Sequence, residues 1–161
     1  MGFLVAVPPN ARALSTLSRV DYEDAFVVET GRAQDQTAER WARAIFEDAP
    51  MPTRRALRWG WLAQGLKLGS ARSDRLVLGW ELRRSTPDFA LLRADSRIGM
   101  PAEILFMRQQ DSLLVAVFVQ HENYIARAVW AGVRPVHRRV SPPIASSGVA
   151  RFVRRRKTDE R

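Results

Sequence analysis

Six polar or aromatic side chains recur at spacings of three and four residues near the C-terminus. They are Asn123, Arg127, Trp130, Arg134, His137 and Ser141. In an α-helix this spacing places side chains on one face. On such a face Arg127 would bind an anionic or carbonyl group, and His137 would act as a switchable proton donor or acceptor. The same pattern also fits an ordinary helix surface, with Asn123 as the cap and the arginines solvated.

Two acidic residues, Glu81 and Glu103, stand among apolar neighbours in segments with β-type patterning. Pointing inward, they would be carboxylates of raised pKa, suited to acid–base catalysis. Pointing outward, they would be ordinary surface charges, which is the interpretation we favour. The two histidines, His121 and His137, have no acidic residue at a metal-ligand spacing. No metal site is therefore predicted.

Aromatic residues provide a second set of candidates. Those that could line an apolar pocket are Trp41, Trp59, Trp61, Trp80, Phe89, Phe106, Phe118 and Trp130. Residues of this kind bind hydrophobic ligands in a concave site, but at helix and strand spacing they also form an ordinary core. The candidate ligand-binding set is Trp80, Glu103, Phe106, Phe118, Asn123, Arg127, Trp130 and His137.

Composition excludes several classes of protein. The chain has 161 residues, of which 46% are hydrophobic, enough for one domain with its own core. It has no cysteine, which excludes disulfides, thiolate catalysis and Cys-ligated metal centres, and no cofactor is expected. The longest strongly apolar run, 113–119, is too short for a membrane span. The N-terminal apolar run stops at Pro8-Pro9, too short for a signal sequence, so a cytoplasmic location is expected.

The net charge of +9 raises the question of a nucleic-acid partner. Along the chain it divides into +2 for residues 1–20, +3 for 21–150 and +4 for 151–161. Of 26 basic residues only two are lysine, a bias typical of GC-rich coding sequence, and a nucleic-acid partner is not expected. Residues 151–161 are interpreted as a disordered, solvated basic tail, with a contact to RNA or anionic lipid as the alternative.

The candidate residues need a scaffold, and hydrophobic periodicity predicts one. Residues 1–20 form an extended lead-in. A first strand near 25–30 is followed by two helices, one over about 36–48 with Asp35 as its cap and one from Pro52 to about Gly69. Four strands then form an antiparallel meander, because short links cannot join parallel neighbours. They lie near 76–82, 89–94, 102–107 and 113–120.

A final helix is predicted over about 123–139, bent at Pro135 and ended by Pro142-Pro143. It would pack on the sheet, whose strand 113–119 is apolar on both faces and should be central and covered on each side. The domain plan is a lead-in over 1–20, a single domain over 21–150 and a tail over 151–161.

This order of elements resembles the α+β helix-grip fold of the START-like and polyketide-cyclase-like (SRPBCC) superfamily, in which an antiparallel sheet curves around a long C-terminal helix. The chain also resembles the bacterial family of uncharacterised proteins DUF2867 over roughly residues 8–151. The resemblance rests on the segments 21–26, 78–80, 123–130 and 134–138. Ala126 stands where the family often has glycine, and about five strands are legible instead of six or seven.

The resemblance implies a cavity between sheet and final helix that binds a small hydrophobic molecule, and it implies no particular reaction. Two alternatives stay open. The first is a cofactor-independent cyclase, isomerase or hydrolase with His137 or Glu103 as its base. The second is a structural or interaction protein with a filled core. We also expect a carboxylate or carbonyl at the sheet edge to hold the Arg127 guanidinium. The oligomeric state is left open.

Overall fold

The protein is described by a computed structural model covering residues 2–161. Seven strands form one antiparallel sheet in the order β1-β2-β7-β6-β5-β4-β3. The strands are β1 (Gly2–Val5), β2 (Tyr22–Glu29), β3 (Leu76–Val77), β4 (Trp80–Ser85), β5 (Phe89–Ala94), β6 (Ala102–Arg108) and β7 (Ser112–Val119). The helices are α1 (Pro9–Arg12), α2 (Ala38–Phe46), α3 (Met51–Ala63) and α4 (Tyr124–Asp159), with a 3₁₀ turn η1 (Ala33–Asp35). The α+β class is confirmed, and the prediction of five strands is an undercount.

One of the two strands that the sequence analysis missed lies in a segment that was predicted to be a single strand. The alternating run near 76–82 predicted a single strand, but it is a hairpin of β3 and β4. Leu78 and Gly79 at its tip have φ values of 48° and 96°. Positive φ at both central positions is the geometry of a two-residue type I′ turn. The apolar alternation continues through the turn, so periodicity alone could not reveal it.

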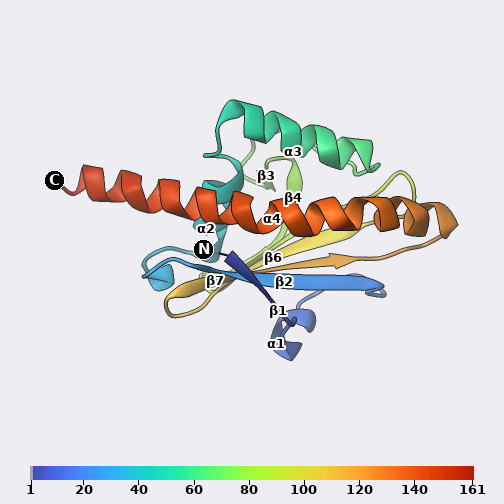
Figure 1. Cartoon of the computed structure of the whole chain (residues 1–161), viewed down its shortest axis with the longest axis horizontal. Helices are drawn as coiled ribbons and strands as arrows, with labels where there is room; N and C mark the ends of the chain where they lie inside the picture. The colour runs from blue at the N-terminus through green and yellow to red at the C-terminus, as the bar shows by residue number, and fades with distance from the viewer. Residues whose placement is uncertain (1) are drawn as a thin grey trace.

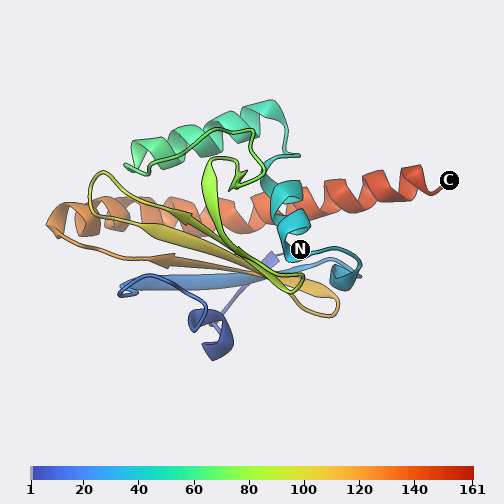
Figure 2. The same cartoon turned by 180° about the vertical axis from the view of Figure 1, so that it is seen from behind.

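The other missing strand, β1, lies within the predicted lead-in and pairs with β2 at the edge of the sheet. Helices α2, α3 and α4 cover one side of the sheet, which we call the inner face (Figure 1). The N-terminal segment with α1 covers the opposite side, the outer face (Figure 2). Residues 1–20 are therefore more than a lead-in, because Ala11, Leu14 and Leu17 pack against the outer face.

Strand β7 is central and covered on both faces, as its sequence predicts. Val115 and Val117 belong to the core of the inner face, whereas Leu114, Ala116 and Phe118 belong to the core of the outer face. The alternation follows from the two-residue period of a strand. Both cores therefore depend on the same strand.

The two helices after β2 differ in how they pack. Helix α2 is capped by Thr37, not by the predicted Asp35, since the Thr37 side chain accepts a hydrogen bond from Arg40 N. Its residues Trp41 and Ile45 are buried against the inner face. Helix α3 begins beside Pro50 and contains no buried residue at all. The broad apolar face predicted for α3 is thus only partly buried.

Helix α4 is much longer than predicted, running 36 residues through Pro135, Pro142 and Pro143. Each proline removes one helical hydrogen bond, but tertiary packing holds the helix together across the break. Beyond the prolines, Phe152 is buried against the Trp41 ring, with centroids 5.1 Å apart. The predicted end near 139 and the disordered tail over 151–161 are therefore wrong, since the helix continues to Asp159. Within residues 2–161, no helix combines the length and apolar character required to span a membrane.

Candidate functional site

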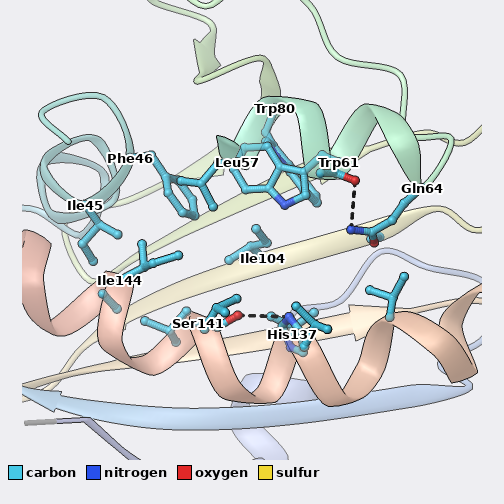
Figure 3. A pocket seen from close by; sticks show the side chains of 18 of the residues that line it. Ile45, Phe46, Leu57, Trp61, Gln64, Trp80, Ile104, His137, Ser141 and Ile144 are labelled. Atoms are coloured by element: carbon cyan, nitrogen blue, oxygen red, sulfur yellow. Dashed lines mark hydrogen bonds between the residues drawn. The ribbon is translucent and has the colours of Figure 1, made fainter. Parts of the chain in front are cut away.

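A cavity of about 710 Å³ lies between the inner face and helices α2, α3 and α4. Figure 3 shows α3 on one wall, α4 on the other and the sheet, with Ile104, between them. The lining is mainly aromatic and aliphatic. It includes Phe26, Phe46, Trp61, Trp80, Ile104, Phe106, Val117, Trp130 and Ile144.

The cavity exists because aromatic side chains hold α3 away from the sheet. The Trp61 ring of α3 meets the rings of Phe46 and Trp80 edge to face, with centroids 5.4 Å apart in each pair. Such contacts are a favoured aromatic geometry. Between these contacts α3 presents Ala56 and Gly60 to the cavity, and their small side chains leave the space open. Gln64 lies on the same wall and donates from Nε2 to the Gly60 carbonyl at 3.1 Å.

The opposite wall carries a chain of polar groups that joins β2 to α4. Tyr22 Oη donates to Asp24 Oδ2 at 2.6 Å, and His137 Nε2 lies 2.9 Å from the same oxygen. His137 Nδ1 in turn lies 3.0 Å from Ser141 Oγ. His137 and Ser141 both line the cavity. We call these four residues the polar relay.

The direction of the hydrogen bonds in the relay follows from Tyr22. Burial, with the hydrogen bond to Asp24, raises the pKa of the Tyr22 phenol, although Arg138 and Arg134 oppose the shift. The phenol therefore keeps its proton and donates a hydrogen bond to Asp24. When Asp24 accepts from both neighbours, Nε2 of neutral His137 carries the proton and Nδ1 accepts from the Ser141 hydroxyl. The Ser141 oxygen is then free to accept a hydrogen bond from a ligand hydroxyl, and its own proton can pass to His137.

Four of the eight predicted binding residues come together in the cavity wall: Trp80, Phe106, Trp130 and His137. The other four do not line it. Phe118 points to the outer face, where it is fully buried. Whether the four cavity residues contact a ligand stays a prediction.

Glu103 is buried, contrary to the favoured interpretation, but on the outer face and away from the cavity. It accepts hydrogen bonds from Ser15 Oγ at 2.7 Å, from Thr16 N at 3.0 Å and from the Thr16 hydroxyl, and Arg93 Nη1 lies 3.7 Å away. These contacts fasten the N-terminal segment to the sheet. Glu103 is thus a structural anchor and cannot serve as a base in the cavity. Glu81 is exposed, as expected for a surface charge.

Asn123 and Arg127 lie at the start of α4, outside the cavity. Asn123 caps the helix by accepting from Ala126 N at 2.9 Å and ties it to the loop by donating to the Ile98 carbonyl at 3.0 Å. Arg127 is exposed, and within residues 2–161 its guanidinium has no hydrogen-bond or ion-pair partner. The expected partner at the sheet edge is therefore absent from this part of the chain, because the side chain projects into solvent.

Sequence reasoning missed Tyr22 and Asp24, and it left Ser141 out of the binding set. A signal for the first two was present. Tyr22 and Asp24 share a face of β2 with the buried Phe26, because alternate residues of a strand point the same way. That alternation predicts an acid and a phenol directed inward, toward the long helix.

Searches against protein-family models, curated proteins and solved structures return no match to this chain. No group of three or more potential metal-ligating side chains comes together within residues 2–161. The lining and the relay together describe the site as an apolar cavity with one polar wall.

Proposed function

We propose that this protein binds a small hydrophobic molecule in the cavity between the sheet and α4. The observation that carries the proposal is an apolar space of about 710 Å³ with a polar relay on one wall. Ligand sites are typically apolar cavities of roughly 300–1,000 Å³ with a few well-placed polar groups. An open space of this size favours binding over a purely structural role, which would call for a filled core.

The polar relay narrows the chemical class of ligand that the cavity would bind. In the relay the Ser141 hydroxyl donates to His137 and His137 Nε2 donates to Asp24, so Ser141 Oγ is left as an acceptor in an otherwise apolar space. A ligand hydroxyl near this oxygen gains a hydrogen bond. A purely hydrocarbon ligand would instead bury these groups without a new partner. We therefore propose an apolar ligand that carries at least one hydroxyl group.

The strand order and the long helix across the inner face support our proposal that the chain is a helix-grip protein. The DUF2867 resemblance is proposed alongside it, on the segments 123–130 and 134–138 of α4. His137 belongs to the second of these segments, and its contacts with Asp24 and Ser141 give that segment a physical role.

Two glycines allow a matched test with the neutral fluorescent probe N-phenyl-1-naphthylamine. Gly60 lines the cavity and Gly132 does not, and a Cβ added at either meets no atom within 4 Å. Gly60→Trp should fill the cavity and weaken probe binding at least about tenfold, whereas Gly132→Trp should bind like the unaltered protein. Native mass spectrometry of protein from its own host should show a retained small molecule. No probe binding and no retained molecule would contradict the proposal.

The relay also favours a second candidate, a cofactor-independent hydrolase. In that reaction the Ser141 hydroxyl would attack an ester carbonyl and pass its proton to His137 Nδ1, while Asp24 holds Nε2. The ester C–O bond would break, the leaving alcohol would take the proton from His137, and water would then hydrolyse the acyl-serine to regenerate Ser141. The protein would then hydrolyse p-nitrophenyl butyrate, and Ser141→Ala or His137→Gln would abolish the activity. Ser147→Ala, an exposed change on the same helix, is the matched control. Ligand binding without any hydrolysis would leave only the binding function.

A further inference from the structure

The positive charge of the protein is concentrated on the two helices that flank the cavity opening. Helix α3 carries three arginines and no acid, and α4 carries eight arginines and one lysine against the single acid Asp159. The two helices thus hold twelve of the 26 basic residues and one of the 17 acidic ones. The rest of the chain has fourteen basic and sixteen acidic residues and is close to neutral. Dividing the net charge by position along the chain did not reveal that the positive charge lies on these two helices.

The charge on these helices is also uncompensated. Of their twelve basic side chains, only Arg156 has an acidic partner within residues 2–161. Elsewhere seven arginines form ion pairs with acids. Unpaired surface charge of one sign attracts a partner of the opposite sign. The two helices therefore present an anion-binding surface.

The same helices carry most of the exposed apolar surface. Seven of the nine large hydrophobic side chains exposed within residues 2–161 lie on them, the exceptions being Phe3 and Leu4. On α3, helical spacing places Met51, Trp59 and Leu62 on the side opposite the cavity, and Trp59 is 72% exposed. On α4, Val136 and Val140 are exposed at the rim of the cavity.

This combination favours an anionic lipid surface over a nucleic acid. Nucleic-acid bases can stack on an exposed Trp side chain, but phosphates and bases offer little to an exposed Leu or Met side chain. An interfacial helix combines arginines, whose long side chains reach the lipid phosphates, with Trp and Leu side chains that enter the headgroup region. Helix α3 fits this description through Arg55, Trp59 and Leu62. Arg55, Trp59 and Leu62 are exposed, so they can contact a membrane while Trp61 keeps its contacts with Phe46 and Trp80.

We propose that α3 and the exposed residues of α4 dock on a membrane surface rich in anionic lipid. On α4 the contacting residues would be the exposed Arg139, Val136 and Val140, which lie beside the cavity. The arginines would contact lipid phosphates, and Trp59 and Leu62 would enter the headgroup region. The proposal goes beyond ligand binding and does not depend on it, since the charge and exposed apolar residues belong to the outside of the molecule.

Flotation with phosphatidylcholine vesicles, with and without phosphatidylglycerol, tests the proposal. The protein should float with the vesicles that contain phosphatidylglycerol, and high salt should release it because each surface cation is then screened. Binding to neither kind of vesicle, or equal binding to both, would overturn the proposal. Binding to RNA or duplex DNA in place of vesicles would also overturn it.

Variants separate the apolar contribution from the electrostatic one. Trp59→Ser with Leu62→Ser should lower vesicle binding about tenfold, and Arg134→Gln with Arg139→Gln should lower it severalfold. All four side chains are exposed, so the thermal unfolding curve should stay unchanged. Arg83→Gln with Arg84→Gln, which removes the same charge from β4, is the control and should bind within about twofold of the unaltered protein. Equal binding by all variants would overturn the proposal. Gly60→Trp, which tests the cavity, should leave vesicle binding unchanged, so the two proposals can fail separately.

Discussion

The two faces of this sheet are built from the same strands but are covered in opposite ways. On the outer face the N-terminal segment packs directly onto Leu105, Ala116 and Phe118, all of which are fully buried. On the inner face, aromatic contacts hold α3 above the strands and a cavity of about 710 Å³ stays open. The difference shows that apolar strands do not determine whether a core is filled. The element that covers them does.

Each face also contains one buried carboxylate, and the two are used differently. Glu103 on the outer face accepts from two hydroxyls and one backbone amide. Asp24 on the inner face binds Tyr22 and His137 through Oδ2, while Oδ1 has no partner in the structure. A fully bonded carboxylate fixes its surroundings, whereas one with spare bonding capacity can take part in binding or proton exchange.

Removing the outer carboxylate should have the largest effect on stability. Glu103→Ala leaves the Ser15 and Thr16 donors and the Arg93 guanidinium without the buried carboxylate that they contact. We expect a loss of about 3–5 kcal/mol in the free energy of unfolding, measured by urea denaturation. Glu81→Ala, an exposed change on β4, should lie within about 0.5 kcal/mol of the unaltered protein. Equal losses for both variants would remove Glu103 as the anchor of the N-terminal segment.

Two neighbouring residues of β6 compare the faces directly. Leu105 points into the packed outer core, and Ile104 points into the cavity. Leu105→Ala should cost about 3 kcal/mol, because it removes contacts on all sides and leaves a void. Ile104→Ala should cost less, about 2 kcal/mol, since part of its side chain faces the cavity. Similar urea midpoints for the two variants would mean that the cavity is closed in solution.

The inner face is tightly packed at one place, where α4 crosses α2. A Cβ at Gly148 would lie 2.7 Å from the Ile45 Cα atom, so the backbone would have to move. Gly148→Ala should therefore destabilise the protein by about 1–3 kcal/mol in spite of the better helix propensity of alanine. Gly132→Ala, on the open side of α4, should instead stabilise it by up to about 1 kcal/mol. A stabilising Gly148→Ala would contradict the close approach.

Periodicity predicted the parts of the fold in which local pattern and tertiary packing agree. The central position of β7 and the existence of α2 and α3 follow from apolar spacing over whole elements. Periodicity failed where a single turn residue or a contact distant in sequence determines where an element ends. The turn at Leu78-Gly79 interrupts a continuous alternation, and Phe152 holds α4 together beyond its prolines by packing on Trp41.

The candidate site was predictable only in part for the same reason. Trp80, Phe106, Trp130 and His137 have apolar or helical spacing that directs them inward. The carboxylate that orients His137 lies 113 residues earlier in the chain, and no local pattern pairs the two. Glu103 was included in the binding set, but it lies on the opposite face of the sheet from the cavity. The two-residue period of β6 places it on the face that the N-terminal segment covers.

The smallest effect is expected from the phenol of the relay, and it should appear only at alkaline pH. Burial and the hydrogen bond to Asp24 raise the pKa of Tyr22 above the ordinary value of 10.0. The folded state therefore holds the phenol proton more tightly than the unfolded chain does. This contribution to stability is complete below about pH 10 and is lost as the pH rises through the pKa of the folded state. The outer face has no tyrosine, so this pH dependence belongs to the inner face.

Urea unfolding from about pH 8 to pH 11 checks this prediction. The unaltered protein should lose stability in the upper part of that range more steeply than Tyr22→Phe, in which the titrating group is removed. The chain has only one other tyrosine, Tyr124, which is 85% exposed on α4, so Tyr124→Phe leaves the phenolate absorbance of Tyr22 alone to be followed. That absorbance should rise only above the normal range for tyrosine, because both burial and the Asp24 carboxylate oppose the phenolate. A Tyr22 titration near pH 10, together with parallel stability curves for the two proteins, would mean that the relay is open to water and that both faces respond to alkali alike.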